Sequence, residues 1–172
     1  MINTRIRTGA LLLGIGLGAM LDAIVFRDLL QWNSMLSATL VPDSLDAWRV
    51  SLAADGLFRA VAWALALAGV VSLWSAFGRP GSLPSSRVFT GYFLLGWGWY
   101  NLLEGLVVHE FLALHHVRDL PARVPSYDWT YLIIGGLGFI AVGLALSRRP
   151  VPRRMADRRA GYERRGTGAA GT

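Results

Sequence analysis

The sequence predicts an all-α membrane protein with four transmembrane helices, built as a tandem duplication of a two-helix hairpin. Two observations lead to this prediction: long apolar blocks separated by polar connections, and an internal repeat at an offset of 82 residues. The chain has 172 residues, the length of one domain, and is 53% hydrophobic. A soluble all-helical protein is the alternative, but the blocks are too long and too poor in charge for that class.

Each apolar block has about twenty residues, the helix length that crosses a hydrocarbon core of about 30 Å. The blocks are residues 8–30, 57–77, 88–114 and 129–146. The first block has a basic start like a signal peptide, but it is too long for a typical signal core and carries Asp22 and Arg27. We therefore predict that it is a helix of the mature protein.

The distribution of charge predicts the orientation. All 17 basic residues are arginines, and most lie before the first block, between the second and third, or after the fourth. The other two connections are richer in acid. The positive-inside rule then places both termini and the middle loop in the cytoplasm of a bacterium whose inner membrane the chain crosses several times. We expect the basic tail, residues 148–172, to be disordered and to contact anionic lipid, not nucleic acid.

The internal repeat aligns residues 5–35 with residues 87–117, where ten of 31 positions are identical without a gap. "RIRTGALLLGIG" lies over "RVFTGYFLLGWG", so glycines and a threonine match as well as leucines. The second helices match more faintly, around an aspartate in each. The repeat predicts two hairpins in the same orientation, residues 1–78 and 79–147, related by an axis along the membrane normal. Glycines would let the first and third helices approach closely.

Every histidine of the chain lies in the segment "NLLEGLVVHEFLALHHV", residues 101–117. On one intact helix its polar residues fall within an arc of about 140°, which indicates a face turned to the bundle interior or a wet cavity. Counting along the helix places this face near the extracytoplasmic side. On the second helix, Asp55 and Arg59 have the spacing of an intrahelical ion pair.

Histidine with carboxylate and without thiolate suits copper, zinc or iron, and histidine also binds haem. The chain has no cysteine, which excludes disulfides and thiolate sites. The predicted metal ligands are Glu104, His109, His115 and His116, and the predicted surrounding residues are Asp22, Arg27, Asn101 and Asp55. On an intact helix His109 and His116 would lie about 10 Å apart along the axis, so other helices or a second subunit would have to complete a site.

Two other interpretations of these polar residues stay open. Arg27 could pair with Glu104 or Asp22 in a purely structural ion-pair network, or Glu104 and His109 could carry protons. No nucleophile triad, phosphate loop or nucleotide site is present in the sequence, so no catalytic residue is predicted.

The sequence resembles a bacterial membrane family known as domain of unknown function 2243. The resemblance covers roughly residues 8–147 and rests on "DGLF" at Asp55 and on "NLLEGLVVHEFLALHHVR". The family pattern has histidine at seven positions. Four of these differ here and are Arg27, Asn33, Ser34 and Arg59.

The resemblance implies a two-fold histidine cluster of which only the second half remains in this chain. It also implies a link to respiratory redox chemistry or cofactor assembly. Two functions follow as expectations. One is a metal- or haem-binding membrane protein. The other is a non-catalytic accessory subunit, which would associate with other membrane subunits or as a homodimer and in which the cluster is structural.

Overall fold

The computed structural model describes residues 4–40, 43–77 and 85–148, and these form helices joined by loops, without strands. The order is α1 (Thr4–Asp22), η1 (Ala23–Leu29), α2 (Leu45–Trp74), α3 (Ser86–Leu103), η2 (Glu104–Phe111), α4 (Pro125–Thr130), η3 (Tyr131–Gly138) and α5 (Phe139–Ser147). The η segments are π-helical continuations, so the eight elements make four long helices. The predicted disordered tail lies almost wholly outside the described residues.

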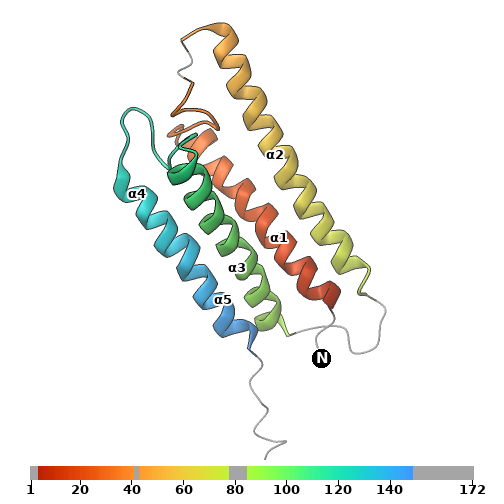
Figure 1. Cartoon of the computed structure of the whole chain (residues 1–172). Coiled ribbons are helices and arrows are strands. Elements are labelled where there is room, and N and C mark those ends of the chain that lie inside the picture. The colour runs from red at the N-terminus through yellow and green to blue at the C-terminus, as the bar shows by residue number, and fades with distance from the viewer. Residues whose placement is uncertain (1–3, 41–42, 78–84, 149–172) are drawn as a thin grey trace, which may run out of the picture.

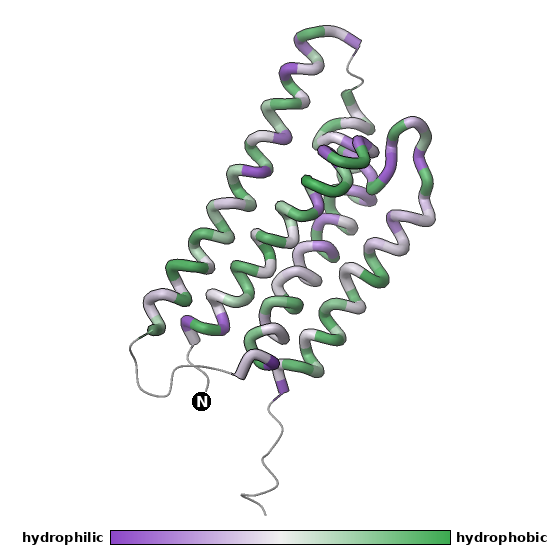
Figure 2. The backbone as a smooth tube through the Cα atoms, turned by 180° about the vertical axis from the view of Figure 1, so that it is seen from behind, coloured by the Kyte–Doolittle hydropathy of each residue, from purple (hydrophilic) through white to green (hydrophobic). Residues whose placement is uncertain are grey.

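The four long helices are arranged in a row (Figure 1). α1 packs against α2 on one side and α3 on the other, and α3 packs in turn against α5. The start of α1 and the end of α5 lie at one end of the bundle, and the two loops that follow η1 and η2 lie at the other (Figure 1). Hydrophilic residues gather in these two loops, whereas the bundle below them is mainly hydrophobic (Figure 2).

Three of the four helices are long and apolar enough to cross a membrane: Thr4–Leu29, Leu45–Trp74 and Pro125–Ser147. The helix formed by α3 and η2 has the length but is richer in tryptophan, tyrosine and glycine, which lowers its mean hydropathy. The second helix begins at Leu45, well before the predicted start at residue 57. Ser44 caps it by accepting a hydrogen bond from the Ala47 backbone N–H, a standard N-cap that the apolar pattern alone does not reveal.

The first and third helices end in the same way. Each finishes in a π-helical segment, and each is followed by a non-glycine residue in the left-handed region, Gln31 with φ of 53° and Ala113 with φ of 47°. A left-handed residue closes a helix by turning its last carbonyls toward later amides. Helix termination at Phe111 corrects the expectation that residues 101–116 form one intact helix. No glycine or proline marks this end, so the sequence gave no ordinary stop signal.

Hydrogen bonds in the two loops also come in matching pairs, 82 residues apart. The Met35 N–H donates to Asp55 Oδ1 over 2.9 Å, and the Val117 N–H donates to Asp128 Oδ1 over 2.8 Å. The loops bind each other as well. The Ala38 N–H donates to the Leu114 carbonyl at 3.0 Å, and the Leu120 N–H donates to the Trp32 carbonyl at 2.8 Å. Each loop is therefore fixed by a carboxylate from the next helix and by its counterpart loop.

Close contact between α1 and α3 depends on two glycines. A Cβ atom on Gly14 would lie 2.0 Å from the Phe93 carbonyl oxygen, and one on Gly96 would lie 2.1 Å from the Leu11 carbonyl oxygen. Because these neighbours are backbone atoms, the helices would have to separate to admit a side chain. Small residues at helix contacts are the usual way in which membrane helices pack tightly.

We predict that Gly14→Ala lowers the stability of the bundle by about 1–3 kcal/mol, the usual cost of overpacking. Gly56→Ala is the matched control, because a Cβ atom there would meet no atom within 4 Å. Alanine is also the better helix former by up to about 1 kcal/mol. Thermal unfolding in detergent should show a lower midpoint for Gly14→Ala and an unchanged or higher one for Gly56→Ala. Equal midpoints for the two variants would contradict the packing described.

Candidate metal centre

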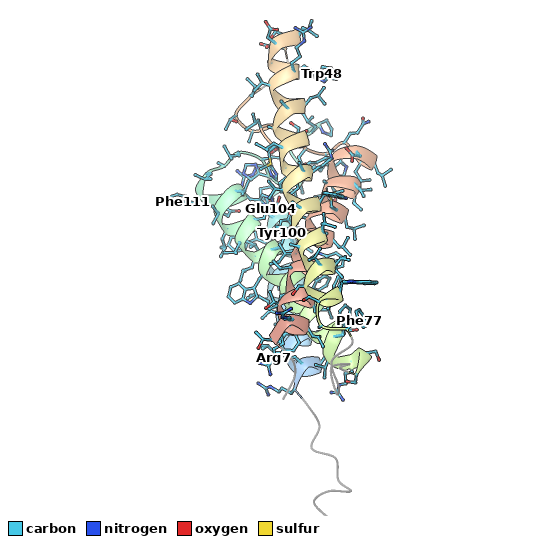
Figure 3. The ribbon with its side chains drawn as sticks, turned by 90° about the vertical axis from the view of Figure 1, so that its right-hand side faces the viewer. Arg7, Trp48, Phe77, Tyr100, Glu104 and Phe111 are labelled. Carbon is cyan, nitrogen blue, oxygen red and sulfur yellow. The ribbon has the colours of Figure 1, made fainter. Side chains whose placement is uncertain are left out.

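Three potential metal ligands converge near the loop end of the bundle: Glu104 and His109 from η2, and His115 from the loop that follows. One ligand atom from each lies within 4.8 Å of the other two. His115 Nε2 lies 3.7 Å from Glu104 Oε1, and the two imidazole centroids are 4.9 Å apart. All three residues are at least 95% buried. Figure 3 shows Glu104 among the helices, whereas Phe111 at the end of η2 projects away from them.

The early end of η2 brings these groups together. After Phe111 the chain turns back at Ala113, so that the His115 ring returns to the level of His109 instead of continuing up a helix. The loop therefore removes the axial separation that an intact helix would impose.

Arg27 from η1 reaches into the same cluster. Its Nη2 atom lies 3.2 Å from Glu104 Oε1 and 3.2 Å from His115 Nε2, and its Nη1 atom lies 3.5 Å from Asp55 Oδ1. The guanidinium also lies 4.2 Å from the centroid of the Phe58 ring. It is thus a buried cation between two carboxylates and directed at a lone pair of His115, the same lone pair that a metal ion would use.

Residues around the ligands hold them in position. His109 Nδ1 lies 3.6 Å from Asp128 Oδ1, the arrangement in which a carboxylate orients a metal-binding imidazole. The Tyr131 hydroxyl lies 2.7 Å from Glu104 Oε2 and 3.1 Å from Asn101 Oδ1. Tyr131 therefore ties the predicted ligand Glu104 to the predicted neighbour Asn101.

Several buried polar atoms of the cluster have no hydrogen-bond partner. Among the described residues they include Arg27 Nη1, His109 Nδ1, His115 Nδ1 and Asp128 Oδ2. Buried polar atoms are normally paired with protein or water, and groups that are not paired call for an explanation such as a water or an ion. A closed structural network would leave few such atoms, so this cluster has unused capacity for a small ligand.

His115 lies in the loop beyond the helix, and burial together with the nearby Arg27 guanidinium lowers its pKa well below the usual value. Its imidazole is therefore neutral at pH 7, the form that binds a metal ion.

The remaining predicted residues take different places. His116 Nδ1 lies 2.9 Å from Asp119 Oδ1, and its ring centroid is 6.5 Å from that of His109, so it adjoins the three ligands without joining them. Asp22 is half-buried and interacts electrostatically with Glu104. Asp55 binds Arg27 and the Met35 N–H.

The expected Asp55–Arg59 pair is wrong. Arg59 is bonded to Asp28 of η1, and Asp55 is bonded to Arg27. The spacing of four residues was right for a helix, but each side chain meets a stronger partner on the neighbouring helix than on its own.

Tyr131 is the main residue of the cluster that sequence reasoning missed. It lies three residues after Asp128, as Phe58 lies three residues after Asp55, so a comparison of the two second helices could have indicated it. Asp128 had been considered only as one of several possible sources of a partner group.

Comparison with known proteins gives a family but no function. No curated protein and no solved structure matches the chain. A family model described as "Predicted membrane protein (DUF2243)" matches residues 9–150. Because this match covers most of the 172 residues, the chain belongs to the DUF2243 family of predicted membrane proteins.

Proposed function

We propose that the chain crosses the membrane four times as two duplicated hairpins, with both termini in the cytoplasm. The helix of α3 and η2 lies between two apolar helices, each of which is long enough to span. The matching helix ends and loop hydrogen bonds at an offset of 82 residues support a duplication. A bacterial inner membrane fits the arginine distribution.

Four spans predict that the loop at residues 112–124 faces the outside and that the start of α3 faces the cytoplasm. Since the chain has no cysteine, Ala122→Cys and Ser86→Cys each give a single thiol at an exposed position. In intact spheroplasts a membrane-impermeant maleimide should label Ala122→Cys, and should label Ser86→Cys only after the membrane is permeabilised. Equal labelling of both variants in intact spheroplasts would contradict this topology.

At the outer end of this bundle, the cluster supports a site for one metal ion. Glu104, His109 and His115 would be the ligands, and Asp128 and Tyr131 would orient them. The observation that carries this proposal is the convergence of three buried ligand atoms within 4.8 Å, surrounded by buried polar atoms without partners. Two imidazoles and one carboxylate suit zinc, copper(II) or non-haem iron.

A single ion fits better than a haem. The two pockets that adjoin the cluster have volumes of about 220 and 290 Å³. Each is smaller than the roughly 300–1,000 Å³ that is usual for organic ligand sites. The inward-facing imidazoles are also too close to a buried arginine to leave an open face for a porphyrin.

Arg27 has a definite part in this proposal. Its guanidinium shares Glu104 Oε1 and His115 Nε2 with the ion, so the two cations compete for the same lone pairs. Arg27 would hold the ligands together when the ion is absent and would turn toward Asp55 when the ion binds. Such a site has a lower affinity than one without the arginine, because like charges at short range repel.

The second candidate function is an accessory subunit in which Arg27 is itself the permanent cation of a structural network. The contacts of Arg27 with both Glu104 and Asp55 favour this candidate. A role in respiratory redox chemistry or cofactor assembly would suit either candidate and rests only on the family resemblance.

Titration with Zn²⁺ and Cu²⁺ tests the metal proposal. The full chain would be purified in mild detergent without a polyhistidine tag, treated with a chelator and dialysed. We expect saturable binding of one ion per chain, which Glu104→Gln should weaken by at least one hundredfold. Tyr127→Phe, on the same helix as Tyr131 but not among the ligands, is the matched control and should bind like the wild type. Wild-type protein that binds no metal above the detergent background would leave the structural network as the function of the cluster.

A further inference from the structure

A groove along the outside of the bundle is separate from the proposed metal ligands. One pocket of about 220 Å³ is lined by residues of α1, η1, α3, η3 and α5, among them Gly18, Leu21, Trp97 and Phe139. A second pocket of about 290 Å³ continues toward the loops. The two pockets share Phe26 and Tyr131 as walls. Together they form a mainly apolar groove of the size usual for organic ligands.

The groove has a polar end. Asp22, Asn101 and Tyr131 line the first pocket, where the other lining residues are apolar or aromatic. The Asp22 carboxylate is half-buried and has no neighbour close enough for an ion pair among the described residues. Asn101 presents an amide, and Tyr131 presents the hydroxyl that also meets Glu104. These groups can accept and donate hydrogen bonds at one point inside an apolar wall.

The depth and charge of this polar end select its occupant. Asp22 ends α1, and η1 continues for seven more residues, so the carboxylate lies on the order of 10 Å below the end of the helix. A phospholipid headgroup stays at the membrane surface, and its phosphate would need a basic partner. Neither pocket has a basic lining residue. An uncharged head with hydroxyl donors fits the carboxylate better.

We propose that this groove binds a hydroquinone with a lipophilic tail. A ring hydroxyl would donate to Asp22, the ring would lie near Asn101 and Tyr131, and the tail would leave past Leu21 and Phe139 into the bilayer. The site does not require the metal ion, since none of the three proposed metal ligands lines the groove. It does lie next to the metal centre, because Tyr131 belongs to both.

Binding of radiolabelled decyl hydroquinone tests this proposal. The full chain would be placed in phosphatidylcholine nanodiscs under argon, with empty nanodiscs subtracted. We expect saturation at one molecule per chain and a dissociation constant at least tenfold higher for Leu21→Trp, which fills the mouth of the groove. Leu17→Trp is the matched control, because both leucines are 44% exposed and Leu17 lies one turn away outside the pockets. Its dissociation constant should change less than twofold.

Further measurements identify the head and separate this proposal from the metal site. Asp22→Asn keeps the shape of the groove and should weaken binding about tenfold, while 1-decanol should not compete. Binding should persist in the presence of EDTA, whatever the result of the metal titration. Non-saturable binding, equal effects of the two tryptophan variants, or full competition by 1-decanol would overturn the assignment. The unfolding midpoint of each variant shows whether it is folded.

Discussion

Arg27→Gln should destabilise the chelator-treated protein and strengthen metal binding. The side chain of Arg27 is 2% exposed, and its removal leaves the carboxylates of Glu104 and Asp55 without their buried cation. Breaking a buried ion pair in this way costs about 3–5 kcal/mol. Glutamine can keep a hydrogen bond to Glu104 but brings no charge, so a divalent ion no longer competes with a guanidinium for the lone pairs of Glu104 and His115.

The two candidate functions differ in what added metal does to this variant. A ligand that binds only the folded state stabilises it in proportion to the logarithm of its concentration over its dissociation constant. If the cluster is a metal site, Zn²⁺ should restore the unfolding midpoint of Arg27→Gln and should raise it by more than it raises the wild-type midpoint. Under the structural-network account, Zn²⁺ restores nothing. Arg49→Gln, which removes an exposed arginine paired with Asp46, is the matched control and should change neither midpoint.

His109→Ala and His116→Ala should differ strongly although both remove a buried imidazole from the same cluster. His109 is one of the three converging ligands, and its Nδ1 faces Asp128, so its loss should reduce metal affinity by at least one hundredfold. His116 is bonded to Asp119 and lies outside the convergent set. Its loss should change affinity by at most about tenfold, the lower range for a residue that supports ligands.

Isothermal titration with Zn²⁺ gives both affinities. A similar loss in the two variants would mean that four residues coordinate the ion, as the sequence alone predicted. A loss only in His116→Ala would contradict the site as it is described.

The sequence was sufficient to predict the helices but not their ends. Apolar composition located the four helices, because a lipid-facing helix must be apolar over about twenty residues. Composition does not fix a boundary where the flanking turns are amphipathic, and so α2 begins at Leu45 and not near residue 57. The end of the third helix depends on the left-handed conformation of Ala113, a residue type that has no special preference for it.

The same limit applies to the cluster. The segment at residues 101–117 indicated its residues correctly, because ionisable groups in apolar helices are rare and costly. Which of them meet is decided by the turn after Phe111 and by contacts between helices, such as Arg27 with Glu104. Those contacts depend on the relative positions of four helices, which no spacing along one helix contains. Helical periodicity therefore paired Asp55 with Arg59, whereas the packed bundle pairs Asp55 with Arg27.

X-ray absorption spectroscopy at the zinc edge, on the full chain loaded with one equivalent of Zn²⁺, tests the central claim most directly. The account predicts a first shell of nitrogen and oxygen only, at about 2.0–2.2 Å, with the outer-shell scattering of two imidazoles. Glu104→Gln and His109→Ala should each remove this signal. A spectrum of hydrated zinc, or a shell of oxygen atoms without imidazole, would contradict a metal centre at Glu104, His109 and His115.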